Sequence, residues 1–251
     1  MLRRVWAVLA ISWLLATANV GIAQNQRYVR NLGSNSPVIV FVHGVLGDGA
    51  ASWATGNVSW PKLVAEDSAF NGASIYVHDY RTTLKTGLSI NELAENLRLR
   101  LIDDGVIDHR ELIFIAHSMG GLVTRQYLLK YRSIAAKTRF LFFLSTPTTG
   151  SELANLASII SRNPQFRDMR LMQSADYLAN LQLDWFAANF GIPTYCAYET
   201  FDTYGIKVVD QASASNLCTR GLDPIQADHI SIAKPTRRTD DQYISFRNAS
   251  R

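Results

Sequence analysis

The chain has 251 residues, of which 47% are hydrophobic and 18% charged, and its formal net charge is +4. These values exclude a disordered chain, because the apolar content is enough for a large core, and the weak positive charge argues against a nucleic-acid partner. Arg3 and Arg4 lie at the extreme N-terminus, and the chain without them carries only about +2. We expect a monomer that binds no nucleic acid.

The first 23 residues have the pattern of a secretory signal peptide. Two arginines precede an apolar core from Val5 to Ala18, and a small-x-small motif ends at Ala23. We predict cleavage after Ala23, with Ala18 as the second choice. The apolar core is short for a spanning helix of about 20 residues, although an uncleaved membrane anchor is the alternative. We therefore expect residues 24–251 to form the mature domain, exported to the periplasm or the medium.

The rest of the chain alternates short apolar runs with amphipathic segments. Strands are expected over 37–43, 73–78, 111–116, 139–145 and 193–198, and helices near 59–66, 89–103, 119–132, within 151–190 and near 240–248. This alternation predicts an α/β fold with a mostly parallel central sheet and helices on both faces. No internal repeat or long linker is present, which favours a single domain.

The strand expected at 111–116 leads directly into Ala-His-Ser-Met-Gly-Gly, residues 116–121. A serine flanked by small residues two positions away, between a strand and a helix, predicts a nucleophile elbow, in which the serine occupies a strained turn. Small residues at 116 and 120 should keep these two positions from colliding with each other. Ala116 stands where glycine is usual. We predict that Ser118 is the nucleophile of a serine hydrolase.

A serine nucleophile needs a base, and after an elbow the acid and the histidine both follow the serine in the chain. Histidines occur at positions 43, 78, 109, 117 and 229. His229 alone follows Ser118, so the order of the partners selects it as the base. It lies in a loop before the final helix, and the alternative is that it only caps that helix.

The acid should stand just after the strand expected at 193–198. Glu199 follows this strand immediately, Asp202 comes three residues later, and Asp210 follows another short apolar run. Either carboxylate type can orient an imidazole and stabilise its protonated form. We place Glu199 first, Asp202 second and Asp210 third. Asp228 adjoins the histidine, so its side chain cannot readily fold back to the ring, and we expect it to shape the loop.

Backbone N–H groups are expected to stabilise the oxygen that gains charge during acyl transfer. The first strand ends in His43-Gly44, where a loop can supply one such group. We predict the N–H of Val45 or Leu46 and that of Met119 as the donors, with His43 shaping the loop. No histidine has a zinc-protease spacing such as His-Glu-x-x-His, and we expect neither a metal nor another cofactor.

Together these motifs resemble an α/β-hydrolase of the lipase and esterase type. The resemblance spans about residues 37–235 and is carried by Phe41 to Gly44, Ala116 to Gly121, Ser145 to Ser151 and Asp228 to Ile230. Within the superfamily the chain is most similar to the branch of serine-active-site lipid-remodelling proteins and glycolipid-anchor inositol deacylases, through Trp53, Trp60-Pro61 and Glu199-Thr200. The resemblance implies the α/β-hydrolase fold and favours Glu199 as the acid.

The expected reaction is hydrolysis of a carboxylic ester through an acyl-enzyme. The apolar side chains within 151–190 favour an apolar acyl chain and a lid or, equally, ordinary core packing. Lipase, phospholipase, esterase and thioesterase activities remain open. The alternatives are a non-catalytic homologue that binds a lipid or a protein, and a hydrolase of C–C or peptide bonds. Arginines near the C-terminus favour transient contact with a lipid surface or, more simply, a solvated helix face.

The two cysteines, Cys196 and Cys218, would enter an oxidising compartment on export. An even pair in such a compartment predicts a disulfide, which would tie down the loop after the acid strand. Two buried thiols are the alternative.

Overall fold

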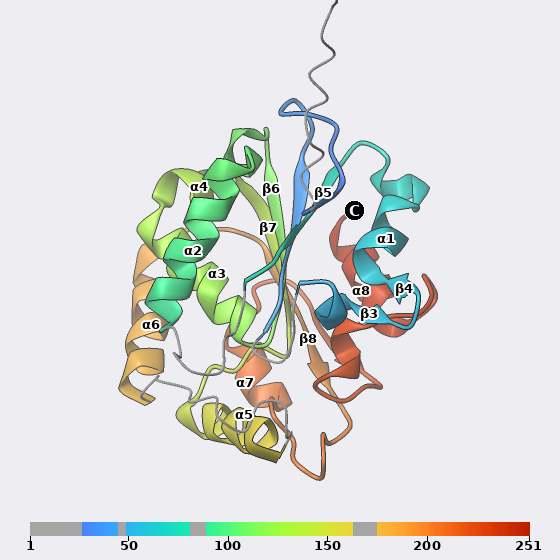
Figure 1. Cartoon of the computed structure of the whole chain (residues 1–251). Coiled ribbons are helices and arrows are strands. Elements are labelled where there is room, and N and C mark those ends of the chain that lie inside the picture. Colours follow the sequence, from blue (N-terminus) through green and yellow to red (C-terminus); the bar gives the residue numbers. More distant parts are fainter. Residues whose placement is uncertain (1–26, 45–48, 81–88, 163–174) are drawn as a thin grey trace, which may run out of the picture.

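The computed structural model describes residues 27–44, 49–80, 89–162 and 175–251 (Figure 1). The predicted signal peptide at 1–23 and its cleavage sites lie outside these ranges, so they stay predictions, as does the start of the mature domain. Within the part of the chain that the structure describes, no helix is both long and apolar enough to cross a membrane.

A seven-stranded sheet forms the centre of the described molecule, in the order β1-β5-β2-β6-β7-β8-β9. Its strands are β1 (Tyr28–Arg30), β2 (Val38–Val42), β5 (Ser74–His78), β6 (Leu112–His117), β7 (Thr138–Leu144), β8 (Thr194–Glu199) and β9 (Leu222–Ile225). β1 is antiparallel to β5, and all other neighbours are parallel. A separate hairpin pairs β3 (Ala54–Thr55) with β4 (Val58–Ser59). The α/β class and the mostly parallel sheet are confirmed.

Helices cover both faces of the sheet (Figure 1). They are α1 (Trp60–Ala65), α2 (Ile90–Asp103), α3 (Met119–Lys130), α4 (Arg132–Lys137), α5 (Gly150–Arg162), α6 (Ala175–Ala188), α7 (Gln211–Ser215) and α8 (Asp241–Ala249). α2, α3, α4 and α6 lie on one face, and α1 and α8 on the other. α5 and α7 lie near the edge of the sheet where the parallel strands end.

The alternation of side chains along each strand divides the core between the two faces. In β2, Val38, Val40 and Val42 pack in the cluster beneath α2 and α3, whereas Ile39 and Phe41 pack with residues of α1 and α8. All five are fully buried. A parallel strand covered on both faces is apolar at every position, which is why these runs were recognisable in the sequence.

The predicted strands and helices are all present, with ends that differ by one to two residues in most cases. The shorter elements β1, β9, α4, α7 and the hairpin were not predicted. β9 contains Asp223 and Pro224 and lies at an edge of the sheet, where a proline is tolerated because one side of the strand is unpaired. Such a segment has no continuous apolar run to signal a strand.

Cys196 and Cys218 form a disulfide, as predicted. Cys196 lies in β8 and Cys218 follows α7, so the bond joins β8 to the segment after α7. The alternative of two buried thiols was wrong.

Much of the apolar segment 151–190 packs against the sheet. Its fully described core members are Leu153, Leu156, Ile159, Leu178 and Leu181. Phe186 on α6 is 60% exposed. The structure does not describe residues 163–174, which include Met169, Leu171 and Met172, so a lid there stays a prediction.

Candidate active site

The candidate site lies where four neighbouring parallel strands end. Val42 pairs with Ala116, His117 with Leu144, and Leu144 with Ala197. The residues that follow β2, β6 and β7, and the last residue of β8, therefore meet at one edge of the sheet. In this way the register places Gly44, Ser118, Ser145 and Glu199 within one small region.

Ser118 occupies a sharp turn between β6 and α3. Its backbone has φ 55° and ψ −130°, a region that non-glycine residues rarely adopt, and its N–H donates to the carbonyl of Leu144 at 2.8 Å. The serine is 1% exposed. The geometry agrees with the predicted elbow, because it raises the serine between a strand end and a helix N-terminus.

The residue that leaves no room for a side chain at Gly120 is not the one expected. A Cβ at Gly120 would lie 2.3 Å from the carbonyl oxygen of Val42 and 2.5 Å from that of His43. The nearest atoms therefore belong to the end of β2, and not to Ala116. Gly44 is constrained too, since a Cβ there would lie 2.8 Å from Ser118 Cβ. The loop after β2 thus passes directly beside the serine.

His229 is fully buried, and its Nε2 lies 2.9 Å from Ser118 Oγ. Its backbone is held on both sides: the N–H donates to Thr203 Oγ1 at 2.9 Å, and the carbonyl accepts from His117 Nε2 at 2.8 Å. Asp228 shapes the loop, as expected, by accepting the N–H groups of the two residues that follow His229. These contacts fix the imidazole over the serine.

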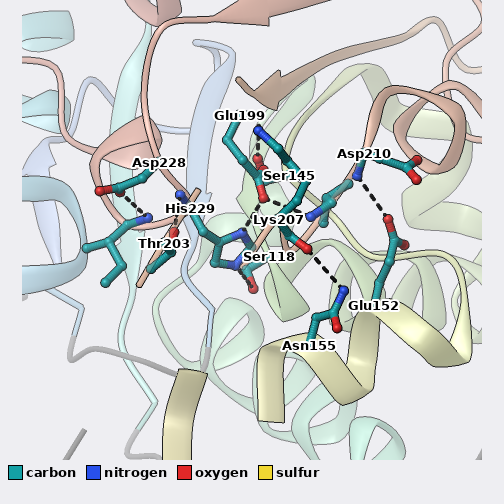
Figure 2. Close-up of polar contacts among 12 residues, drawn as sticks. Ser118, Ser145, Glu152, Asn155, Glu199, Thr203, Lys207, Asp210, Asp228 and His229 are labelled. Atoms are coloured by element: carbon teal, nitrogen blue, oxygen red, sulfur yellow. Dashed lines mark hydrogen bonds and ion pairs between the residues drawn. The ribbon is translucent and has the colours of Figure 1, made fainter. Parts of the chain in front are cut away.

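Glu199 ends β8 and presents its carboxylate to the other side of the imidazole (Figure 2). Its Oε1 lies 3.4 Å from His229 Nδ1 and accepts the Val209 N–H at 2.8 Å. The two alternative carboxylates lie elsewhere. Asp202 has a 53% exposed side chain and pairs with Lys207 at 3.3 Å, and Asp210 caps α7. Of the three, the structure brings Glu199 to the histidine.

The surroundings of Glu199 favour its ionised form. Burial by itself raises the pKa of the carboxyl. His229, Ser145 and the Val209 N–H together lower it by more than burial raises it, so the pKa lies below its ordinary value. The neighbouring His117 is neutral, whereas Glu199 is ionised. Burial holds the pKa of His117 well below its ordinary value. A neutral His117 can donate from Nε2 to the His229 carbonyl without adding charge to the site.

Met119 is the first residue of α3 and is 4% exposed. The first N–H groups of a helix point out of its end and attract negative charge, which suits the predicted role of the Met119 N–H. Val45 and Leu46 lie in the segment 45–48, outside the described residues, so the second donor stays a prediction. His43 shapes the start of that loop, since its Nδ1 donates to the Gly44 carbonyl at 2.6 Å.

Three supporting residues of the site were not predicted as such. They are His117, Thr203 and Ser145. Ser145 belongs to a motif that was recognised in the sequence, but Thr203 has no local signal, because its partner His229 lies 26 residues away in the chain. In the ranges the structure describes, no group of three or more histidine, cysteine, aspartate or glutamate side chains could hold a metal ion.

The chain is similar to a known protein family and to several individual proteins. Residues 39–235 match the model of the Alpha/beta hydrolase family. Protein SERAC1 of Bos taurus is 26% identical over 238 residues, covering 80% of this chain and 36% of the relative, and the Homo sapiens protein is 26% identical over 246 residues. The chain spans about a third of the length of these curated relatives. Their similarity supports the predicted branch of serine-active-site lipid-remodelling proteins.

Solved structures share the fold at low sequence identity. Phospholipase PlaB from Legionella pneumophila has a TM-score of 0.62 at 15% identity, covering 86% of this chain and 60% of that one. Bacillus licheniformis lipase BlEst2 has a TM-score of 0.54 at 17% identity, covering 80% and 87%. The family match, which extends over most of the chain and agrees with the observed sheet, shows that the chain belongs to the alpha/beta hydrolase family.

Proposed function

We propose that the protein is a serine hydrolase that cleaves carboxylic esters, with Ser118 as nucleophile, His229 as general base and Glu199 as the acid that orients it. The observation that carries this proposal is the buried line of contacts from Ser118 Oγ to His229 Nε2, and from His229 Nδ1 to Glu199 Oε1. Burying a carboxylate and an imidazole costs free energy, and such buried ionisable pairs are concentrated at functional sites, which favours a catalytic role over a structural one.

In the acylation step, Ser118 Oγ attacks the ester carbonyl carbon while His229 Nε2 takes the hydroxyl proton. The carbonyl oxygen becomes negatively charged and is stabilised by the Met119 N–H and a second N–H from the loop after β2. The C–O bond to the alcohol then breaks, and the protonated His229 gives its proton to the leaving oxygen. Glu199 stays ionised throughout and stabilises the imidazolium.

Deacylation repeats the same steps with water. His229 removes a proton from a water molecule as its oxygen attacks the acyl carbon, and Ser118 leaves as the alcohol and regains the proton. The products are one carboxylic acid and one alcohol for each ester and water consumed. Apart from the ester and water, the proposed steps use only groups of this chain.

The substrate we propose is an ester with an apolar acyl chain, including lipid esters. The lipase and phospholipase names of the structural neighbours support this class. We further propose that the protein is exported. The Cys196–Cys218 disulfide supports export, because such bonds persist mainly in oxidising compartments. Intact-mass measurement of the exported protein should give a chain that begins after residue 23, and a full-length chain would contradict cleavage.

The test is hydrolysis of p-nitrophenyl esters from acetyl to palmitoyl, together with labelling by a fluorophosphonate. We expect Ser118→Ala to abolish labelling and to lower kcat by at least roughly 1,000-fold, and Glu199→Gln to lower kcat by roughly 1,000-fold or more. The matched control is Asp202→Asn, which removes an exposed carboxylate and should leave kcat within about twofold.

The acyl chain length that gives the highest kcat/KM then separates a lipase from a short-chain esterase. A folded wild-type protein that neither hydrolyses any ester nor reacts with the probe would contradict the proposal. That result would favour the alternative of a non-catalytic homologue that binds a lipid or a protein. Labelling without ester hydrolysis would indicate another acyl substrate, such as a thioester.

A further inference from the structure

Ser145 is a second strained serine beside the elbow. It follows β7, has φ 43°, and is 1% exposed. Ser118 has the same kind of backbone at the end of the neighbouring strand. A positive φ at a buried residue other than glycine is uncommon and persists only where surrounding contacts require it. The contacts of Ser145 therefore indicate what the strain serves.

Those contacts lead to the carboxylate proposed as the acid. Ser145 Oγ accepts the backbone N–H of Glu199 at 3.2 Å (Figure 2). The Ser145 N–H donates to the carbonyl of Ala197 at 2.8 Å. A hydroxyl that accepts one N–H still has its own proton to donate. The same hydroxyl favours the ionised form of the Glu199 carboxylate. Ser145 thus contacts the end of β8 through both its backbone and its side chain.

The carboxylate is also held by the segment 207–210. Glu199 Oε1 accepts the Val209 N–H, and α5 anchors the residues on both sides of Val209 (Figure 2). Asn155 Nδ2 donates to the Lys207 carbonyl at 3.0 Å, and Glu152 accepts the Asp210 N–H at 3.2 Å. Because α5 begins at Gly150, the stretch from Ser145 into α5 supports Glu199 directly through Ser145 and indirectly through the segment 207–210.

We infer that Ser145 is a positioning residue for Glu199, and that its strained backbone serves to aim the hydroxyl at the end of β8. The inference rests on the proposed function, in which Glu199 orients His229. A carboxylate 3.4 Å from its imidazole has little margin, because a shift of about 1 Å in a reacting group can cost 100-fold in rate. Ser145 and the Val209 N–H together restrict that shift.

The experiment compares Ser145→Ala and Ser145→Gly with the control Ser74→Ala. Alanine removes the hydroxyl and keeps the strain, whereas glycine removes both. Ser74 is also fully buried, and its Oγ accepts the Leu32 N–H at 2.9 Å and lies 2.9 Å from Ser36 Oγ, but it is at the start of β5, where the parallel strands begin and not where they end. Ser74→Ala therefore removes a buried hydroxyl that accepts a backbone N–H, as Ser145→Ala does, at a place far from the site.

We expect both Ser145 variants to lower kcat by roughly 10- to 100-fold with KM within about twofold, and Ser74→Ala to leave both constants near those of wild type. A second readout is the NMR resonance of the His229 Nδ1 proton in the resting protein. It should shift in both Ser145 variants and stay unchanged in Ser74→Ala, because it reports the contact between His229 and Glu199 directly.

Two outcomes would overturn the inference. One is wild-type kcat and an unchanged resonance in Ser145→Ala. The other is a glycine variant with wild-type properties beside an impaired alanine variant, since the backbone and not the hydroxyl would then matter. If wild type itself hydrolyses no ester, the proposed function fails, yet the resonance still tests whether Ser145 positions Glu199.

Discussion

The elbow and the acid region differ in how the chain builds them. Ser118 is placed by its own neighbours in sequence, since β6, the turn and α3 are contiguous and Gly120 lets the turn approach β2. Glu199 is placed by residues from three separate segments: Ser145 after β7, Val209 before α7, and His229 before α8. The position of Ser118 thus depends on one contiguous turn and its close approach to β2, whereas the position of Glu199 depends on three contacts with segments far apart in the chain.

The largest expected effect breaks the elbow. Gly120→Ala places a Cβ against two backbone carbonyls, which cannot move aside as a side chain can, so we expect a loss of about 3 kcal/mol or more in the free energy of unfolding, and loss of activity. Urea denaturation measures it. The control is Gly72→Ala, where the new Cβ meets nothing within 4 Å. A Gly120→Ala protein as stable as that control would contradict the close approach of the elbow to β2.

The next largest effect is expected when the disulfide near Glu199 is removed. Replacing Cys196 and Cys218 together by alanine removes a bond that closes a separation of 22 residues. We expect the free energy of unfolding to fall by about 3 kcal/mol, because the unfolded chain regains the freedom of that loop. A reductant should destabilise the wild type by a similar amount and leave the double variant unchanged. Equal stability of the wild type with and without reductant would show that the bridge contributes nothing.

The smallest expected effect is on the pH dependence of the free energy of unfolding, which should differ between the two regions. The pKa of His117, beside the elbow, lies well below its ordinary value, so its contribution to stability is present above about pH 6.5 and is lost as the pH falls below it. The pKa of Glu199 is also lowered, so its contribution is lost only below about pH 4.3.

His117→Gln should therefore reduce the slope of unfolding free energy against pH between about 6.5 and 5, by up to ~1.4 kcal/mol per pH unit. Glu199→Gln should reduce it only below about pH 4.3. Urea denaturation at a series of pH values provides the measurement. If His117→Gln left the slope above pH 5 unchanged, His117 would not remain neutral in the folded protein.

Several features were predictable because they depend on neighbours in the chain. The parallel strands were recognisable, since burial on both faces makes every position of β2 or β6 apolar. Ser118 could be predicted from the turn around it, and His229 from its position after the serine. The prediction that Gly120 must be small was right in outcome, but the neighbour that requires it belongs to β2, which no local pattern could indicate.

The amino-acid sequence by itself determined the fold class, the elbow and the identity of the histidine, because periodicity, turn sterics and chain order are local properties. Only the tertiary structure decided which carboxylate faces the histidine, since Glu199, Asp202 and Asp210 differ little in sequence but greatly in what lies beside them. It also decided the role of Ser145, whose partner is 54 residues away. Contacts of that range depend on strand register and loop path, which are set by the packing of the whole domain.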